Sequence, residues 1–130
     1  MNTLRLAAVA AALSLATPAA AITINYDMGG NVASYIMKFS SARKPIRIMG
    51  HCASACTIAL RYPSTCVGPR ARLTFHSVSG AGRYTANFNR IVMSAYPPAV
   101  RSWIRARGGL TSRAITLSGP ALRKRVRSCT

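Results

Sequence analysis

Residues 45–61 read PIRIMGHCASACTIALR, and this stretch indicates the fold class most clearly. Its first part, Pro45–Met49, alternates apolar and other side chains as a strand does, with the isoleucines on the inward face. Gly50–Ala53 is predicted as a tight connection, and Ser54–Arg61 as a short apolar helix that Pro63 ends. A strand that leads directly into a helix is the building unit of an α/β domain.

Strands and helices also alternate on either side of this stretch. The further predicted elements are strands over 22–26, 66–67, 73–76 and 115–117, a helix that Asn31 caps, helices around 88–92 and 100–104, and a last helix that opens at Gly119-Pro120. Such alternation implies right-handed crossovers and a mainly parallel sheet. We therefore expect residues 22–130 to form a single α/β domain, with a small, mostly parallel sheet, crossover helices and a helical C-terminal cover.

The first 21 residues have the organisation of a secretory signal peptide. Arg5 supplies a positive charge, Leu6–Ala16 is apolar apart from Ser14, and small residues lead up to Ala21. The apolar run is too short to span a bilayer. We expect cleavage after Ala21, export to the periplasm or the medium, and no transmembrane segment in the mature form.

The chain is strongly basic, with 18 Lys and Arg residues against a single acid and a formal net charge of +17. A charge of this size attracts polyanions. The basic residues are scattered, however, and only Arg123-Lys124-Arg125 forms a run, without a nucleic-acid-binding motif. We expect nonspecific contact with polyanions and no specific nucleic-acid partner. A cationic envelope protein, whose charge performs its function, stays open as an alternative.

Four cysteines follow the signal peptide: Cys52, Cys56, Cys66 and Cys129. An even number in an exported chain predicts two disulfides, for which three pairings exist. Because Cys66 lies just past the helix that would contain Cys56, we favour Cys56–Cys66 with Cys52–Cys129. The spacing from His51 to these cysteines does not fit a zinc finger or ribbon. No metal and no other cofactor is expected.

The candidate catalytic residues lie at predicted strand ends. Ser54 stands where a strand meets a helix, so its hydroxyl lies beside free backbone N–H groups. His76 ends a later strand and could accept the serine proton if the two strands are neighbours. The Gly29-Gly30 turn ends another strand at the same edge, where it lets the backbone approach a substrate. A nucleophile, a base and amide donors on one edge are the components of acyl transfer.

These motifs, taken in order, resemble the Clp peptidase branch of the Clp/crotonase superfamily. The residues Cys52–Thr57 read Cys-Ala-Ser-Ala-Cys-Thr, as in small exported bacterial (periplasmic) proteins of that branch. The resemblance implies a serine hydrolase that acts on a peptide or a small acyl substrate. Ser54 would be the nucleophile and His76 the general base, and the amides of Gly30 and Ala55 would form the oxyanion hole.

The chain lacks the acidic residue that the family's pattern would place after the histidine. The peptidases of the family have an acid downstream of the histidine, whereas this chain has none after Asp27. Asn87, Asn89 or a backbone carbonyl would then have to hold the imidazole. The chain is also short for the family, so we expect no ring assembly. An inactive scaffold that binds a peptide or a protein partner is therefore the second interpretation.

Overall fold

A computed structural model describes residues 21–41 and 45–130 of the chain. The predicted signal peptide lies outside these residues except for Ala21. The elements, in chain order, are β1 (Ile22–Asp27), α1 (Val32–Ser40), β2 (Ile46–Ala53), the 3₁₀-helix η1 (Ser54–Arg61), β3 (Cys66–Val67), β4 (Arg72–Phe75), the 3₁₀-turn η2 (Gly82–Tyr84), α2 (Thr85–Ser94), α3 (Pro98–Arg105), β5 (Ile115–Ser118) and α4 (Gly119–Arg123). Within the described ranges, none of the helices has the length and apolar character needed to cross a membrane.

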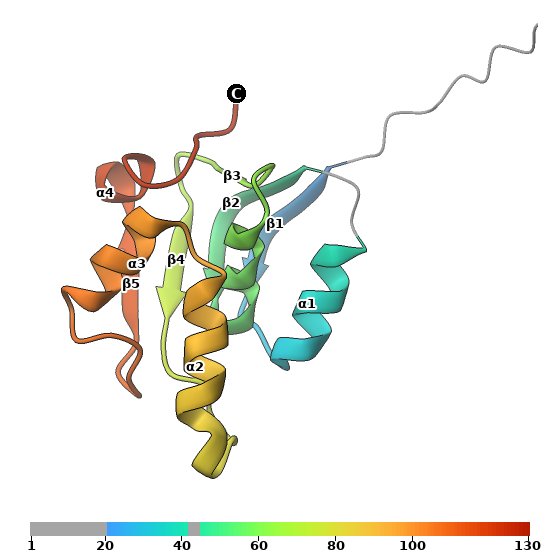
Figure 1. Ribbon diagram of the computed structural model, residues 1–130. Helices are drawn as coiled ribbons and strands as arrows, with labels where there is room; N and C mark the ends of the chain where they lie inside the picture. The colour runs from blue at the N-terminus through green and yellow to red at the C-terminus, as the bar shows by residue number, and fades with distance from the viewer. Residues whose placement is uncertain (1–20, 42–44) are drawn as a thin grey trace, which may run out of the picture.

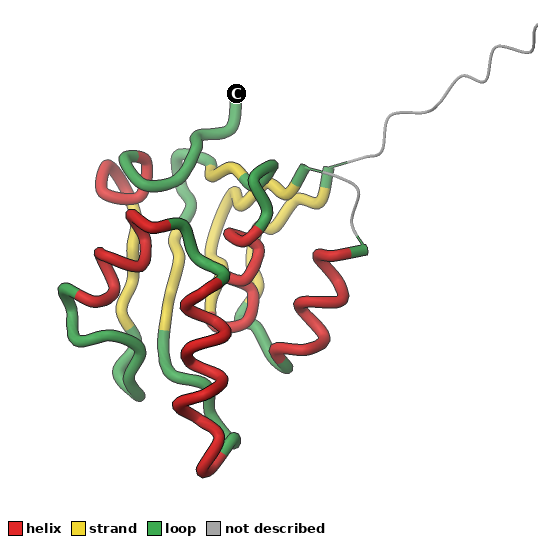
Figure 2. Tube along the Cα trace, in the orientation of Figure 1, coloured by secondary structure: helices red, strands yellow, loops and turns green. Residues whose placement is uncertain are grey.

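The strands form one sheet in the order β1-β2-β4-β5, and β3 pairs with β2 outside this path. β1, β3 and β4 run parallel to β2, whereas β5 is antiparallel to β4. The helices α1, η1, α2 and α3 lie over one face of this sheet (Figures 1 and 2). The expected α/β class with a mostly parallel sheet is confirmed.

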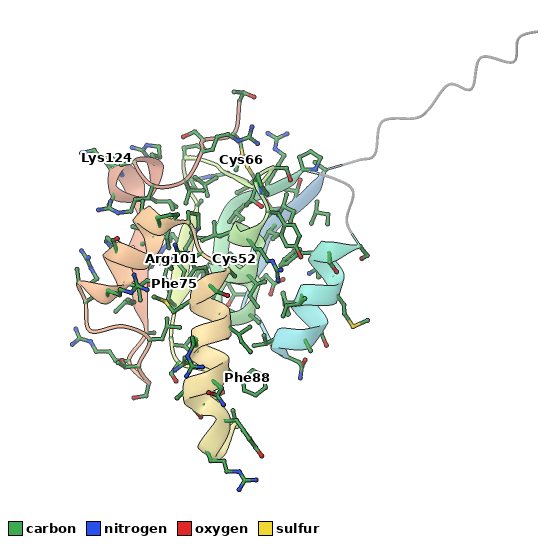
Figure 3. The ribbon with its side chains drawn as sticks, in the orientation of Figure 1. Cys52, Cys66, Phe75, Phe88, Arg101 and Lys124 are labelled. Atoms are coloured by element: carbon green, nitrogen blue, oxygen red, sulfur yellow. A yellow bond between two sulfur atoms is a disulfide. The ribbon has the colours of Figure 1, made fainter. Side chains whose placement is uncertain are left out.

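Alternation along the strands places apolar side chains under the helices. Ile46 and Ile48 of β2 and Phe75 of β4 are almost fully buried, and Phe75 lies in the interior in Figure 3. On β2 and β4, His51 and Thr74 are only partly buried, and a polar ladder links them to Thr116 on β5. The His51 Nε2–Thr74 Oγ1 and Thr74 Oγ1–Thr116 Oγ1 distances are both 2.9 Å. His51 therefore has a structural partner.

β2 is longer than the sequence predicts, because the residues after Met49 continue the strand to Ala53 instead of forming a connection. The pairing with β1 contains a bulge on β2, because the three steps from Ile48 to His51 stand against only two steps from Ile24 to Tyr26. A Cβ on Gly50 would lie 2.0 Å from the carbonyl oxygen of Asn25, so this glycine makes room for the irregular strand. Gly50 is thus a packing residue within a strand and not a turn residue.

Both disulfides are present, but the favoured pairing is wrong. The bridges are Cys52–Cys56 and Cys66–Cys129, and the described residues include no free cysteine. Cys66 pairs in the sheet with Arg47, near the start of β2, whereas Cys52 lies five residues further along that strand. At about 3.3 Å per residue, Cys66 is too far along the sheet from Cys52 for a disulfide. The same holds for Cys56, which is bonded to Cys52.

The Cys66–Cys129 bridge instead fastens the C-terminal segment to β3. The Cys129 amide donates to the Val67 carbonyl over 2.9 Å, and Val67 forms an isolated parallel bridge with Ser128. Figure 3 shows Cys66 toward the end of the molecule where the chain terminates, with Cys52 in the interior. The two bridges therefore act on different parts of the domain.

Candidate active site

Ser54 occupies a strained position at the turn from β2 into η1. Its φ is 56°, and it is the only non-glycine residue with a positive φ among those the structure describes. The preceding Ala53 is still extended, with φ −122° and ψ 155°. The left-handed region costs an L-residue about 1–2 kcal/mol. A serine held this way on a sharp strand-to-helix turn has its side chain presented outward, as in a nucleophile elbow.

The Gly29-Gly30 turn packs directly against this elbow. Gly29 has φ +81°, and a Cβ on it would lie 2.6 Å from the Ala53 carbonyl oxygen and 2.7 Å from the Ser54 Cβ. Only a glycine allows this approach, since either the conformation or the contact would strain another residue. The turn after β1 and the turn after β2 thus meet at one edge of the sheet.

Two buried hydroxyls hold the backbone of Ser54 from the other side. The Thr57 hydroxyl donates to the Ser54 carbonyl oxygen over 2.6 Å and lies 2.6 Å from the Tyr96 hydroxyl. Because Thr57 has only one proton to donate, Tyr96 must donate to Thr57. Burial is the main cause that raises the pKa of Tyr96 well above its usual value, so this donor stays protonated. The hydrogen-bonded chain Tyr96–Thr57–Ser54 therefore links the segment after α2 to the elbow.

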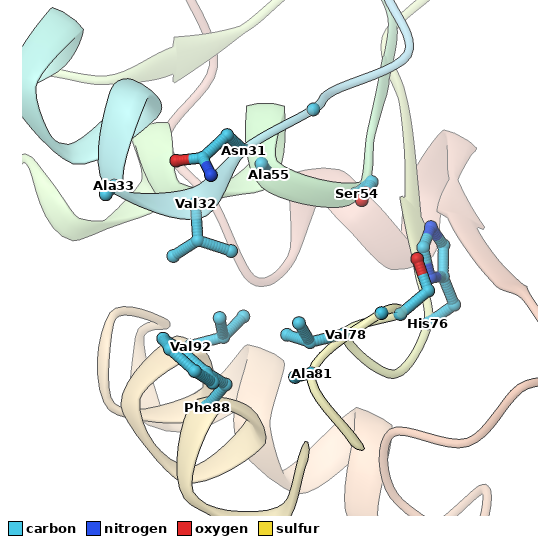
Figure 4. A pocket seen from close by; sticks show the side chains of 13 residues that line it. Asn31, Val32, Ala33, Ser54, Ala55, His76, Val78, Ala81, Phe88 and Val92 are labelled. Atoms are coloured by element: carbon cyan, nitrogen blue, oxygen red, sulfur yellow. The ribbon is translucent and has the colours of Figure 1, made fainter. Parts of the chain in front are cut away.

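Ser54 and His76 line the same pocket, which has a volume of about 300 Å³. Both side chains are half-buried, and Figure 4 shows them at one end of the pocket. Val32, Phe88 and Val92 lie toward the other end in the same view. The remaining lining residues are Gly30, Asn31, Ala33, Ala55, Val78, Ser79, Gly80 and Ala81. The pocket therefore joins a polar end, with the two candidate catalytic residues, to a mostly apolar end that Asn31 also lines and that has no charged side chain.

A backbone carbonyl orients the imidazole of His76. The Nδ1 atom lies 2.8 Å from the Ser77 carbonyl oxygen, and since a carbonyl can only accept, Nδ1 carries the proton. In the neutral ring, Nε2 is then the acceptor that a general base needs. One of the holders expected from the sequence, a backbone carbonyl, is the one that contacts His76.

Asn89 supports this carbonyl indirectly, and Asn87 does not. Asn89 accepts from the Val78 amide over 2.8 Å and donates to the Ser77 hydroxyl over 2.9 Å, so it holds the segment that follows His76. Asn87 is exposed, and its side chain forms no hydrogen bond with another described residue. Of the two asparagines proposed from the sequence, only Asn89 has a structural connection to the histidine.

No hydrogen bond joins the Ser54 hydroxyl to His76 in the described part of the chain. Proton transfer requires a donor–acceptor distance of about 2.6–3.2 Å, although catalytic contacts are often long until substrate is bound. The two residues thus share a pocket without forming the contact that acid–base chemistry would use.

The backbone amides of two residues that line the pocket have no hydrogen bond to another described group. Gly30 and Ala55 both line the pocket, and among residues 21–41 and 45–130 neither of their N–H groups donates to a partner. Ala55 is the second residue of η1, in the first turn, where helix amides lack partners within the helix. Free amides of this kind can stabilise an oxyanion.

Asp27 belongs to the Gly29 turn and not to the histidine. Its Oδ1 accepts from the Gly29 amide over 2.9 Å and from the Tyr35 hydroxyl, and its Oδ2 lies 3.4 Å from Lys38 Nζ. Burial raises the pKa of this carboxyl, but the hydrogen bonds from Tyr35 and Gly29 and the charge of Lys38 outweigh it and hold the pKa below its usual value. The single acid of the chain therefore stabilises the turn.

The described residues contain no group of three or more His, Cys, Asp or Glu side chains that could hold a metal ion. All four cysteines are in disulfides. The residues that reasoning from the sequence missed are Thr57 and Tyr96, since 39 positions separate them and only their contact reveals a role.

Comparisons with known proteins give a distant likeness in structure. No model of a known protein family matches the chain, and no curated protein matches it. Among solved structures, the ClpP1 N165D mutant from Listeria monocytogenes matches with a TM-score of 0.49 and 19% sequence identity. The match covers 83% of this chain and 71% of that one.

Proposed function

We propose that this protein is an exported serine hydrolase that performs peptidase-like acyl transfer on a peptide or a small acyl substrate. Ser54 is the nucleophile and His76 the general base. The amides of Gly30 and Ala55 stabilise the oxyanion of the tetrahedral intermediate.

One observation carries the proposal: a strained serine and a histidine share a pocket with two free amides. Ser54 has positive φ where β2 ends, and His76 lies just past β4, the neighbouring parallel strand. Backbone strain at a non-glycine residue costs stability and clusters at functional sites. The His76 tautomer supports the base role, because the Ser77 carbonyl accepts a hydrogen bond from Nδ1–H, which leaves Nε2 as an acceptor.

The reaction would begin with attack by the Ser54 hydroxyl on the substrate carbonyl carbon while His76 Nε2 takes the hydroxyl proton. Collapse of the intermediate breaks the bond to the leaving group, which receives that proton, and leaves an acyl-Ser54. Water then repeats the sequence and releases the acid. Since no carboxylate orients His76, we expect slow turnover, by analogy with the roughly 10⁴-fold loss when an amide replaces the triad acid.

A fluorophosphonate label tests the proposal on purified mature protein with both disulfides intact. We expect stoichiometric labelling at Ser54, abolished in Ser54→Ala and reduced at least about 100-fold in rate in His76→Ala, as removal of a general base requires. His51→Gln is the matched control for the histidine, and Ser79→Ala is the control for another serine on the same pocket. Unchanged labelling in Ser54→Ala would refute the nucleophile.

An inactive scaffold that binds a peptide or protein partner is the second candidate. The observation that favours it is that Ser54 and His76 share the pocket without a hydrogen bond between them. On this alternative, an activated ester such as p-nitrophenyl acetate would acylate wild type and Ser54→Ala at the same rate. A difference between the two rates would exclude it.

Export is part of the proposal and has its own test. The signal-peptide pattern of residues 1–21 supports it, and two disulfides are compatible with an oxidising compartment. Mass spectrometry of the protein recovered from the cell envelope or the medium should find Ile22 as the first residue. An intact N-terminus on the recovered protein would count against export by this route.

The positive charge supports nonspecific polyanion contact as an accompanying property. Asp27, the single acid, is already paired with Lys38. Binding to heparin should therefore weaken steeply with salt, in proportion to the number of ions released. If charge alone performs the function, Ser54→Ala should leave it intact.

A further inference from the structure

The Cys52–Cys56 disulfide spans the elbow that carries Ser54. Cys52 is the second-last residue of β2 and Cys56 the third of η1, and Ser54 lies midway between them. The Cα atoms of the two cysteines are 5.4 Å apart, and both residues are fully buried. A closed ring of five residues thus contains the strained φ of Ser54.

So short a ring stabilises the protein less than a long one by constraining the unfolded chain, because that effect grows with the length of the closed loop. Cys66–Cys129 closes a loop with a sequence separation of 63, against 4 for Cys52–Cys56. The short bridge is also fully buried against η1, where it restricts local geometry. Its main consequence is therefore expected at the elbow itself.

We propose that the Cys52–Cys56 disulfide is a positioning element that imposes the left-handed conformation of Ser54. The reactivity of Ser54 then depends on this bridge and not on Cys66–Cys129. The part of this inference that concerns reactivity rests on the proposed function. Its conformational part concerns φ of Ser54 alone and can be tested without any activity.

A double-mutant cycle on stability tests the conformational part. With the bridge present, Ser54→Gly should raise the denaturation midpoint, because glycine adopts positive φ without strain. In Cys52→Ala/Cys56→Ala, where the elbow can relax, Ser54→Gly should give no increase. In Cys66→Ala/Cys129→Ala, which serves as the matched control, the increase should return. An equal increase in all three backgrounds would overturn the proposal.

A second measurement covers the case that Cys52→Ala/Cys56→Ala does not fold. Dithiothreitol reduces a bridge to two thiols and is itself oxidised to a cyclic disulfide, with two electrons transferred. If the bridge imposes strain on Ser54, Ser54→Gly should make Cys52–Cys56 harder to reduce at equilibrium and leave Cys66–Cys129 unchanged. Alkylation and mass spectrometry read each pair separately, and an unchanged Cys52–Cys56 equilibrium would contradict the proposal.

The reactivity part uses the fluorophosphonate labelling rate in folded protein. We expect a loss of about 100-fold in Cys52→Ala/Cys56→Ala, as small misplacements of reacting groups cause. Cys66→Ala/Cys129→Ala should keep a rate within about twofold of wild type, since that bridge does not touch the elbow. Equal loss in both variants would overturn the positioning role. If wild type is not labelled at all, the proposed hydrolase fails, and the stability cycle alone decides the conformational inference.

Discussion

Gly29 lies against Ser54 so closely that a Cβ on the glycine would come within 2.7 Å of the serine Cβ. The two residues belong to the turns that follow the neighbouring parallel strands β1 and β2. This contact fixes the distance between the Gly29-Gly30 turn and the first amides of η1. The candidate oxyanion hole therefore exists only while these two turns remain in contact.

Gly29→Ala should destabilise the protein more than an alanine at an open glycine with the same φ. Gly109 provides that control, with φ +80° and nothing within 4 Å of the point where a Cβ would lie. Both variants should lose about 1–2 kcal/mol for the left-handed conformation. Gly29→Ala should lose a further 1–3 kcal/mol or so for the forced contact. Chemical denaturation measures both, and equal losses would show that the approach of Gly29 is not restrictive.

The two disulfides should differ in their contribution to the free energy of unfolding. With separations of 63 and 4 residues, loop-closure entropy predicts that removing Cys66–Cys129 costs more than removing Cys52–Cys56. The expected losses are about 4 and about 2 kcal/mol. Paired Cys→Ala variants in guanidinium denaturation test this order. A larger loss for the short bridge would show that loop-closure entropy does not determine this order.

The buried hydroxyls of Thr57 and Tyr96 should be coupled. Thr57→Val leaves the Tyr96 hydroxyl without its acceptor and removes the side-chain hydrogen bond to the Ser54 carbonyl, and Tyr96→Phe leaves Thr57 short of a donor. Each change should cost about 1–3 kcal/mol. The double variant should cost less than the sum, because one deletion already breaks the chain of hydrogen bonds. Strictly additive losses in chemical denaturation would argue against a connected network.

Substitution of Asn89 should lower stability and slow labelling, whereas substitution of Asn87 should not, although both residues lie on α2. Asn89→Ala removes two hydrogen bonds to the segment after His76 and should cost about 1–2 kcal/mol. It should also slow labelling of Ser54, since the Ser77 carbonyl that holds His76 belongs to that segment. Asn87→Ala, at an exposed position, should change stability by less than about 0.5 kcal/mol. Equal effects of the two changes on labelling would remove Asn89 from the site.

The acid dependence of stability should come largely from one side chain, because Asp27 is the only Asp or Glu in the chain. Its pKa is lower in the folded protein than in the unfolded chain, so it stabilises the fold above about pH 4, the usual value for this group. This contribution is lost as the pH falls through the folded pKa.

Asp27→Asn should therefore be less stable than wild type at pH 6, and the difference should shrink below about pH 4. Tyr35→Phe should show part of the same effect, since the Tyr35 hydroxyl donates to Asp27. At alkaline pH the wild type should resist ionisation of Tyr35, because burial and the neighbouring carboxylate raise the pKa of Tyr35 to about 12. A difference between wild type and Asp27→Asn that is the same at about pH 2 and about pH 6 would contradict the assignment.

Hydrophobic periodicity in the sequence was sufficient for the α/β class and the order of elements. The apolar alternation of β2 and the helical spacing in α1 are local properties, which short-range physics determines. The junction at Ser54 also follows from local pattern, since an extended run meets an apolar helix there. The predicted strand over 73–76, which His76 ends, follows from local pattern for the same reason.

The features that depend on contacts between distant segments could be read only from the folded structure. The cysteine pairing follows from β3 lying beside the start of β2, and the length of β2 follows from its bulged pairing with β1 as far as Cys52. The strain at Ser54, the Thr57–Tyr96 contact and the Ser77 carbonyl on His76 likewise arise only when chain segments come together. Local propensity carries no information about such contacts, because their geometry is set by neighbours that the sequence places far away.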